Sequence, residues 1–216
     1  MLYCFGLTYK SYCMSKESKI YKNIYIENID VSGLTESDAI KKLNNSLYKK
    51  DSIELFYGDK KYNLSLNEIN FKFKVEDAVN KAINIGRDSD FFNNIKTKFN
   101  LSIGKSIKLN VDTEYDKAKL NEYINNLSKE IDITPVDATI TVENNNFNII
   151  KEVYGVNLKK EALLSEIEKN IKNKKFGNIN IYTETINPKY TYEKLVNINT
   201  LLGQYETKFN SKNQNR

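Results

Sequence analysis

Two stretches decide the fold, because they carry one pattern: YNLSLNEINFKFKVEDAVNKAI at residues 62–83 and FNIIKEVYGVNLKKEALLSEI at residues 147–167. In each, a short alternating run leads through a glutamate, Glu68 or Glu152, into apolar residues at helical spacing. The offset of 84 residues between these glutamates also relates Ala78 to Ala162 and Ile83 to Ile167. One supersecondary unit has been used twice, and the sequence predicts a pseudo-duplicated α+β fold.

Strand and helix signals alternate around this repeat, and hairpin turns such as Gly58-Asp59 favour mainly antiparallel sheets. The expected strands cover residues 23–29, 52–57, 61–66, 106–111, 138–142, 147–153 and 179–183. Three helices are expected in the first part of the chain: one after a cap at Thr35, one from Val75 to a stop at Gly86, and one shortly after residue 92. Two more are expected after a cap at Asp112 and after a bend at Gly155. A last helix is expected from Tyr190 to Gly203, with Leu195 and Ile198 facing inward. The two repeat halves are then residues 23–104 and 105–186.

Composition excludes several kinds of chemistry. The chain has no histidine, and its two cysteines, Cys4 and Cys13, both precede the repeat. Ser-His-Asp or Cys-His catalysis and a Cys/His zinc site are therefore excluded from the body of the protein. We expect no catalytic residues, no metal and no cofactor. The net charge of +5 comes from mixed-sign residues along the whole chain, which favours an ordinary solvated surface and argues against nucleic-acid binding.

The first segment, Met1 to Tyr12, is apolar and aromatic, and lysines follow it within residues 1–22. It is too short to cross a bilayer by itself, since about 20 residues are needed. Two interpretations remain open. The segment is the remnant of a signal anchor whose beginning lies upstream, followed by a polar stalk, or it is a disordered apolar leader.

Three motifs in order resemble known proteins of the bacterial cell envelope. The stretch 28–43, NIDVSGLTESDAIKKL, resembles the lead-in of VanW-family ectodomains. Residues 82–87, 135–138 and 154–158 are similar to the peptidoglycan-binding domain of those proteins, which also stands ahead of L,D-transpeptidase domains; the domain is expected at about residues 60–165. Residues 187–216 look like the truncated start of a VanW domain.

This resemblance implies a non-catalytic, membrane-anchored protein of a Gram-positive cell, with an extracellular ectodomain that associates with peptidoglycan or another cell-wall polymer. Two alternatives stay open: an inert spacer that presents a missing VanW domain, and a carboxylate-based wall hydrolase. The chain departs from the family where Asn70 replaces a frequent glycine, but asparagine also tolerates a positive φ. The sequence gives no oligomeric state.

Three residues are candidates for ligand binding. Arg87 could hold a carboxylate of a peptide stem with its planar guanidinium, or it could pair with Asp88 or Asp90, or cap its helix. Tyr154 could stack on a sugar ring, or pack at a helix entry. Asp137 could hydrogen-bond a ligand, or close a turn through its own backbone. Glu68 and Glu152, the symmetric carboxylates of the repeat, are better explained by a shared structural role than by catalysis.

Overall fold

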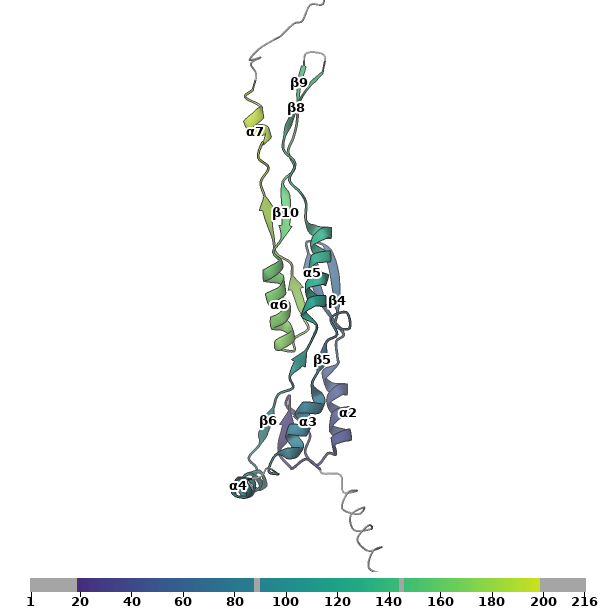
Figure 1. Ribbon diagram of the computed structural model, residues 1–216, viewed down its shortest axis with the longest axis vertical. Helices are drawn as coiled ribbons and strands as arrows, with labels where there is room; N and C mark the ends of the chain where they lie inside the picture. Colours follow the sequence, from purple (N-terminus) through teal and green to yellow (C-terminus); the bar gives the residue numbers. More distant parts are fainter. Residues whose placement is uncertain (1–18, 88–89, 144–145, 199–216) are drawn as a thin grey trace, which may run out of the picture. The chain divides into compact units, whose positions relative to one another are not determined.

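The computed structural model describes residues 19–87, 90–143 and 146–198 of the 216-residue chain. Within these ranges it holds six helices and twelve strands, and the strands form small sheets of two or three (Figure 1). Five of the strand pairings are antiparallel and two are parallel. The predicted α+β class with mainly antiparallel sheets is confirmed.

The chain forms two compact units, and each combines early and late parts of the sequence. The first unit contains the described residues of Met1–Asn126 together with Lys160–Ile181, and the second contains those of Leu127–Lys159 and Tyr182–Arg216. Helix α5 (Lys117–Ile131) has residues in both units. The units thus differ from two consecutive halves of the chain, because α6 (Lys160–Lys172) returns to the first unit.

The described chain begins with two short strands where the sequence predicted one. Strands β1 (Ile24–Ile26) and β2 (Ile29–Asp30) pair antiparallel, and β6 (Ile107–Leu109) runs parallel to β1. Glu27 and Asn28 between them have φ angles of 51° and 62°, and two successive left-handed residues reverse the chain as in a tight hairpin turn. The single strand expected over residues 23–29 is therefore wrong, since its alternation belongs to both arms of a hairpin.

Helix α2 (Glu36–Leu47) begins at the predicted cap. The Thr35 hydroxyl accepts a hydrogen bond from the backbone N–H of Asp38 at 3.2 Å and donates one to the Asp38 carboxylate at 2.9 Å. This exchange satisfies one of the free N–H groups of the first helical turn. Ala39 and Leu43 are fully buried and form the inner face of the helix.

The first copy of the repeat contains a hairpin, a short strand and a helix. Strands β3 (Ser52–Tyr57) and β4 (Lys60–Ser65) form the predicted hairpin, followed by β5 (Lys72–Phe73) and α3 (Val75–Asn84). Asn70 lies before β5 with a φ of 50°. The prediction that asparagine can hold this turn in place of glycine is confirmed.

The second copy repeats that order with β8 (Thr139–Glu143), β9 (Asn146–Ile150), β10 (Gly155–Leu158) and α6. The strand expected over residues 179–183 is divided into two. Strand β11 (Asn178–Asn180) pairs parallel with β3 in the first unit, whereas β12 (Thr183–Ile186) pairs antiparallel with β10 in the second. The expectation of one closing strand is wrong, because its two ends join different sheets.

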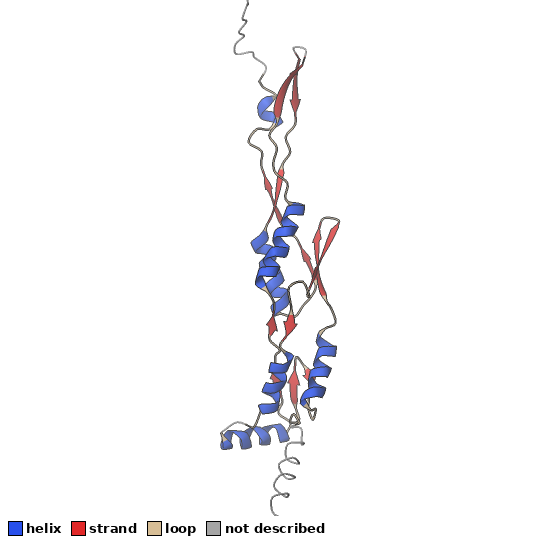
Figure 2. Cartoon of the chain, turned by 45° about the vertical axis from the view of Figure 1, so that its right-hand side comes forward, coloured by secondary structure: helices blue, strands red, loops and turns tan. Residues whose placement is uncertain are grey.

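Between the copies lie α4 (Phe91–Ser102), β7 (Thr113–Glu114) and α5. The helix predicted after residue 92 is present as α4, which projects from the side of its unit beside β6 (Figures 1 and 2). Asp112 does not cap α5. Residues 113–114 pair with β5 instead, and the Asp116 carboxylate accepts from the N–H groups of Ala118 and Lys119 at 2.9 and 3.1 Å.

The two units differ in the size of their apolar cores. In the first unit, side chains from both strands and helices are fully buried, among them Ile24, Leu43, Leu55, Leu64, Leu120 and Ile167. Phe71, Phe73 and Phe176 pack edge to face with ring centroids 4.9 to 6.1 Å apart. In the second, the buried apolar residues are fewer: Leu127, Ile131, Ala138 and Leu158.

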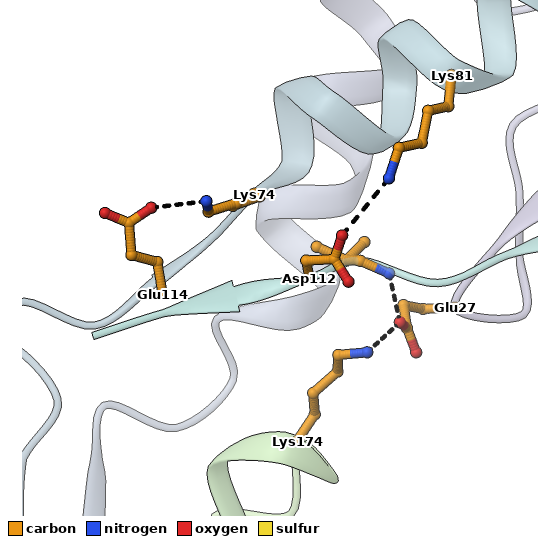
Figure 3. A network of polar contacts seen from close by, with 7 residues as sticks. Glu27, Lys74, Lys81, Asp112, Glu114 and Lys174 are labelled. Atoms are coloured by element: carbon orange, nitrogen blue, oxygen red, sulfur yellow. Dashed lines mark hydrogen bonds and ion pairs between the residues drawn. The ribbon is translucent and has the colours of Figure 1, made fainter. Parts of the chain in front are cut away.

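Ion pairs connect elements of the first unit, and Figure 3 shows three of them: Glu27 with Lys174, Lys74 with Glu114, and Lys81 with Asp112. Glu27 and Lys174 are each only 19% exposed. The Glu27 carboxylate also accepts from the backbone N–H of Val111 at 2.7 Å. The turn between β1 and β2 is thereby joined to the end of α6, which comes from the second copy of the repeat.

The last described element is the short helix α7 (Tyr192–Leu195). It begins two residues after Tyr190, where the helix was expected to start. Leu195 is half-buried, but Ile198 is exposed, so its predicted inward position is wrong. The remainder of the expected helix, residues 199–203, lies outside the described residues.

Candidate functional site

The second unit brings two predicted site residues close together on one antiparallel pair. Val136 and Val153 form a β-bridge with two backbone hydrogen bonds of 2.9 Å. Asp137 follows one bridge residue and Glu152 precedes the other, so the two carboxylates lie opposite each other across the pair. Tyr154 follows Val153. Alternate residues of an extended chain point to the same side, so Tyr154 shares the side of Glu152.

Both carboxylates accept hydrogen bonds from the backbone of the segment that leads into α7, Lys189 to Tyr192. One oxygen of Asp137 accepts from the backbone N–H groups of Lys189 and Tyr190 at 2.6 and 3.1 Å. Glu152 accepts from the backbone N–H of Tyr192 at 2.7 Å. The backbone N–H of Ala138 donates to the Tyr190 carbonyl at 2.9 Å. Asp137 thus closes a contact with a distant segment, where the sequence suggested a turn of its own.

Two exposed tyrosine rings of this segment lie beside cations, and the exposed Tyr154 shares its side of the strand pair with Glu152, which contacts the segment. Tyr154, Tyr190 and Tyr192 are between 37% and 49% exposed. The Lys189 ammonium lies 5.1 Å from the ring centroid of Tyr190, and that of Lys151 lies 5.3 Å from the ring of Tyr192. We call these five residues the tyrosine cluster. A tyrosine offers an apolar ring face with a polar hydroxyl tip, and a lysine offers a flexible ammonium, so the cluster suits a ligand with apolar, hydroxyl and carboxylate groups.

Arg87 belongs to the first unit and supports its backbone. Its guanidinium donates to the Ile83 carbonyl in the last turn of α3, and to the Lys19 carbonyl at 2.7 Å. It also stacks over the Tyr21 ring at 4.4 Å. A cation at a helix C-terminus satisfies free carbonyls and opposes the helix dipole. Among the residues that the structure describes, no ion pair involves Arg87.

The glutamates related by the repeat make different backbone contacts. Glu68 accepts from the backbone N–H of Ser65 at 3.2 Å, within its own turn. Glu152 accepts from Tyr192, forty positions further along the chain. Glu68 belongs to the first unit and Glu152 to the second, and the repeat relates them by their position in the sequence.

Sequence reasoning missed a polar hollow on α3. It has a volume of about 460 Å³ and is lined by Asp77, Asn80, Lys81, Asn84 and Ile85. The signal was available, because the first four recur at the spacing of one helical face. The Asn84 amide already donates to the carbonyl and side-chain oxygen of Asn80 at 3.0 and 2.9 Å, so part of this lining is satisfied internally.

Neither a metal site nor a membrane-spanning helix is seen in residues 19–87, 90–143 and 146–198. No three histidine, cysteine, aspartate or glutamate side chains gather there in a way that could hold a metal ion. No helix in these ranges has the length and apolar content needed to cross a bilayer.

A family model described as "Putative peptidoglycan binding domain" matches residues 62–180, which is more than half of the chain. The chain belongs to this peptidoglycan-binding family. The match begins in β4 and ends in β11, so it covers the whole of α6, which extends past the end expected at residue 165. Searches of curated proteins and of solved structures found no match.

Membership in the peptidoglycan-binding family indicates association with a cell-wall polymer and a location related to the cell wall. The description of this family names a binding role. Lys151 and Tyr154 of the tyrosine cluster lie inside the matched residues, whereas Lys189, Tyr190 and Tyr192 follow them. The described residues that line the α3 hollow all lie inside the match.

Proposed function

We propose that this chain is a non-catalytic cell-envelope protein whose body faces the wall and binds peptidoglycan through the tyrosine cluster. Its N-terminal segment holds it at the membrane, and its arrangement is that of the N-terminal region of a VanW-family protein of a Gram-positive cell. The observation that carries the proposal is the family match over residues 62–180, which runs from within β4 of the first copy through α6 of the second.

The chemistry of the cluster supports peptidoglycan as the ligand. Sugar rings present apolar C–H faces and many hydroxyl groups, and the stem peptides carry carboxylates. The rings of Tyr154, Tyr190 and Tyr192 supply flat apolar faces, and their hydroxyls can donate or accept hydrogen bonds. Lys151 and Lys189 lie beside two of these rings and can pair with a carboxylate. Asp137 and Glu152 keep the segment in place through its backbone, so little ordering is needed on binding.

The test is co-sedimentation of the full chain with peptidoglycan sacculi stripped of teichoic acid, at low and high salt. We expect binding that persists at high salt, because ring stacking is not screened. Tyr154→Ala and Tyr192→Ala should each weaken binding roughly fivefold, as expected for truncation of an aromatic residue at the centre of an interface. Tyr182→Ala is the matched control, since Tyr182 is 62% exposed in the same unit but outside the cluster.

Binding lost at high salt would contradict the proposal and reduce the interaction to surface charge. Equal binding by wild type, Tyr154→Ala and Tyr192→Ala would leave the wall association in place but remove the tyrosine cluster as its site. The α3 hollow would then be the next surface to alter.

A spacer that binds nothing is the second candidate function. Its support is that Arg87 and Asp137, two of the predicted ligand contacts, are engaged within the fold. A folded chain that fails to sediment with sacculi at either salt would favour the spacer. The carboxylate hydrolase has less support, because Glu68 and Glu152 both accept from backbone N–H groups.

A further inference from the structure

Helix α4 carries an exposed apolar face that its own unit does not cover. Its outward side chains, together with the residue after the helix, are between 51% and 82% exposed: Phe91, Phe92, Ile95, Phe99 and Ile103. At 3.6 residues per turn these positions fall within about a third of the helix circumference. Leu101, which is buried, lies on the opposite side. Isolated exposed apolar residues are normal, but a continuous stripe on one helix indicates a binding surface.

Cations border this stripe. Lys96 and Lys98 are exposed and follow its two edges on the helix, and Lys105 and Lys108 come shortly after the helix ends. Asp90 is the only carboxylate in residues 90–110, and it caps the helix by accepting from the backbone N–H of Asn93 at 3.0 Å. Lysines beside an apolar stripe can extend their ammonium groups toward phosphate while their stems stay on the apolar side.

The start of the described chain lies against α4. The Asn23 amide donates to the Leu101 carbonyl at 2.9 Å, and the Lys98 ammonium is 5.7 Å from the Tyr21 ring. Lys19 is joined through its carbonyl to Arg87, shortly before the helix. Six residues separate Lys19 from Tyr12, the end of the apolar segment, and a fully extended chain over this distance reaches about 25 Å. A membrane that holds the apolar segment is therefore within reach of α4.

We propose that the apolar face of α4 binds the surface of an anionic lipid bilayer, with its three phenylalanines and two isoleucines at the acyl boundary and its lysines at the lipid phosphates. This surface is distinct from the tyrosine cluster, which is in the other unit. It uses the proposed N-terminal membrane contact only to bring the bilayer within reach. The helix lies on the membrane and does not span it.

The absence of tryptophan from the chain permits a specific test. Phe92→Trp places a single reporter at the most exposed position of the stripe. The full chain also carries Leu2→Ser, Phe5→Ser and Leu7→Ser, so that the N-terminal segment does not drive binding. With vesicles of phosphatidylcholine and phosphatidylglycerol, we expect the emission to shift to shorter wavelength and to be quenched by brominated acyl chains.

Two further variants make the test specific. Phe99→Ser in the same background should reduce partitioning into these vesicles roughly tenfold or more, because a large apolar side chain no longer leaves water. Tyr182→Trp, without the Phe92 reporter, should show no shift, since this exposed residue lies outside α4. Sacculus binding by the Phe99→Ser variant should be unchanged, which separates this surface from the proposed wall contact.

Three results would overturn the proposal. An unshifted Phe92→Trp spectrum in a chain that retains its circular dichroism would show that the face does not enter lipid. Equal partitioning into vesicles of phosphatidylcholine alone would remove the role of the lysines. A shift that depends on protein concentration and needs no lipid would assign the stripe to contact with a second copy of the chain.

Discussion

Asp137 shows how a residue suited to ligand binding can serve the fold. Its carboxylate accepts from the backbone of Lys189 and Tyr190, both more than fifty positions away. The sequence offered two roles, a ligand contact or a local turn, because only near neighbours can be read from spacing. Tyr154 differs, since its ring remains exposed, and its role as a ligand contact stays a prediction.

Gly155 is required because the backbone near Ile133 and Pro135 approaches it closely, and not because the chain bends there. A Cβ at this position would lie 2.7 Å from the Ile133 carbonyl oxygen and 2.7 Å from Cδ of Pro135. Gly155→Ala must therefore displace backbone, and we expect the second unit to lose about 1–3 kcal/mol of unfolding free energy. Denaturant titration followed by circular dichroism measures this loss. Gly177→Ala is the control, because a Cβ at Gly177 would meet no atom within 4 Å and its backbone is unstrained; equal effects would refute the explanation.

Among the elements, the first helix cap and the first hairpin turn of the repeat follow the sequence, whereas pairing between distant strands does not. Thr35 begins α2 as predicted, and β3 and β4 flank Gly58-Asp59. By contrast, the parallel pairing of β11 with β3 joins segments far apart in the sequence. A cap depends on a side chain and the next three N–H groups. A parallel pairing depends instead on the path by which the intervening chain brings two distant strands side by side.

One contact between elements gives the protein a pH dependence. The Tyr115 hydroxyl donates to Glu168 of α6 at 2.6 Å. Burial, together with this hydrogen bond, raises the pKa of Tyr115 from 10.0 to about 12. The contact stabilises the fold fully below pH 10, and the contribution is lost as the pH rises toward 12, because the unfolded chain releases its proton first.

Tyr115→Phe should lower the unfolding free energy by about 1 kcal/mol at neutral pH. Its stability should then fall less steeply than that of the wild type between pH 10 and pH 12. The same hydrogen bond lowers the pKa of Glu168, so the carboxylate's contribution is lost as the pH falls through that lowered value. Thermal unfolding across both ranges measures these slopes. Parallel curves for the two proteins at high pH would contradict this role of Tyr115.

At the scale of the whole molecule, the two units are stabilised unequally. The β3–β4 hairpin buries Ile53, Leu55 and Leu64, whereas Val142, Phe147 and Ile150 of the β8–β9 hairpin are all exposed. Hydrophobic burial is the main favourable term in folding. The same supersecondary element therefore contributes a core strand pair in one unit and a largely solvated one in the other.

This difference predicts unequal hydrogen exchange. Amides of β8 and β9 should exchange at lower opening free energy than the matched amides of β3 and β4, because exposed hairpins open locally. Exchange followed by mass spectrometry on the full chain gives both values in one experiment. Saturating sacculi should slow exchange near Tyr154 if the tyrosine cluster is the wall contact. Equal protection of the two hairpins without ligand would contradict the unequal cores.

Neighbouring residues and their period were enough to predict the α+β class, the duplicated hairpin–helix unit, the Thr35 cap and the left-handed turn at Asn70. The resemblance of the sequence to peptidoglycan-binding proteins agrees with the family match. The folded chain alone shows which segments pair at long range, that Arg87 and Asp137 contact distant backbone, and that the apolar face of α4 is exposed. The physical reason is that local periodicity specifies which face of an element is apolar, whereas only the packed chain determines what covers that face.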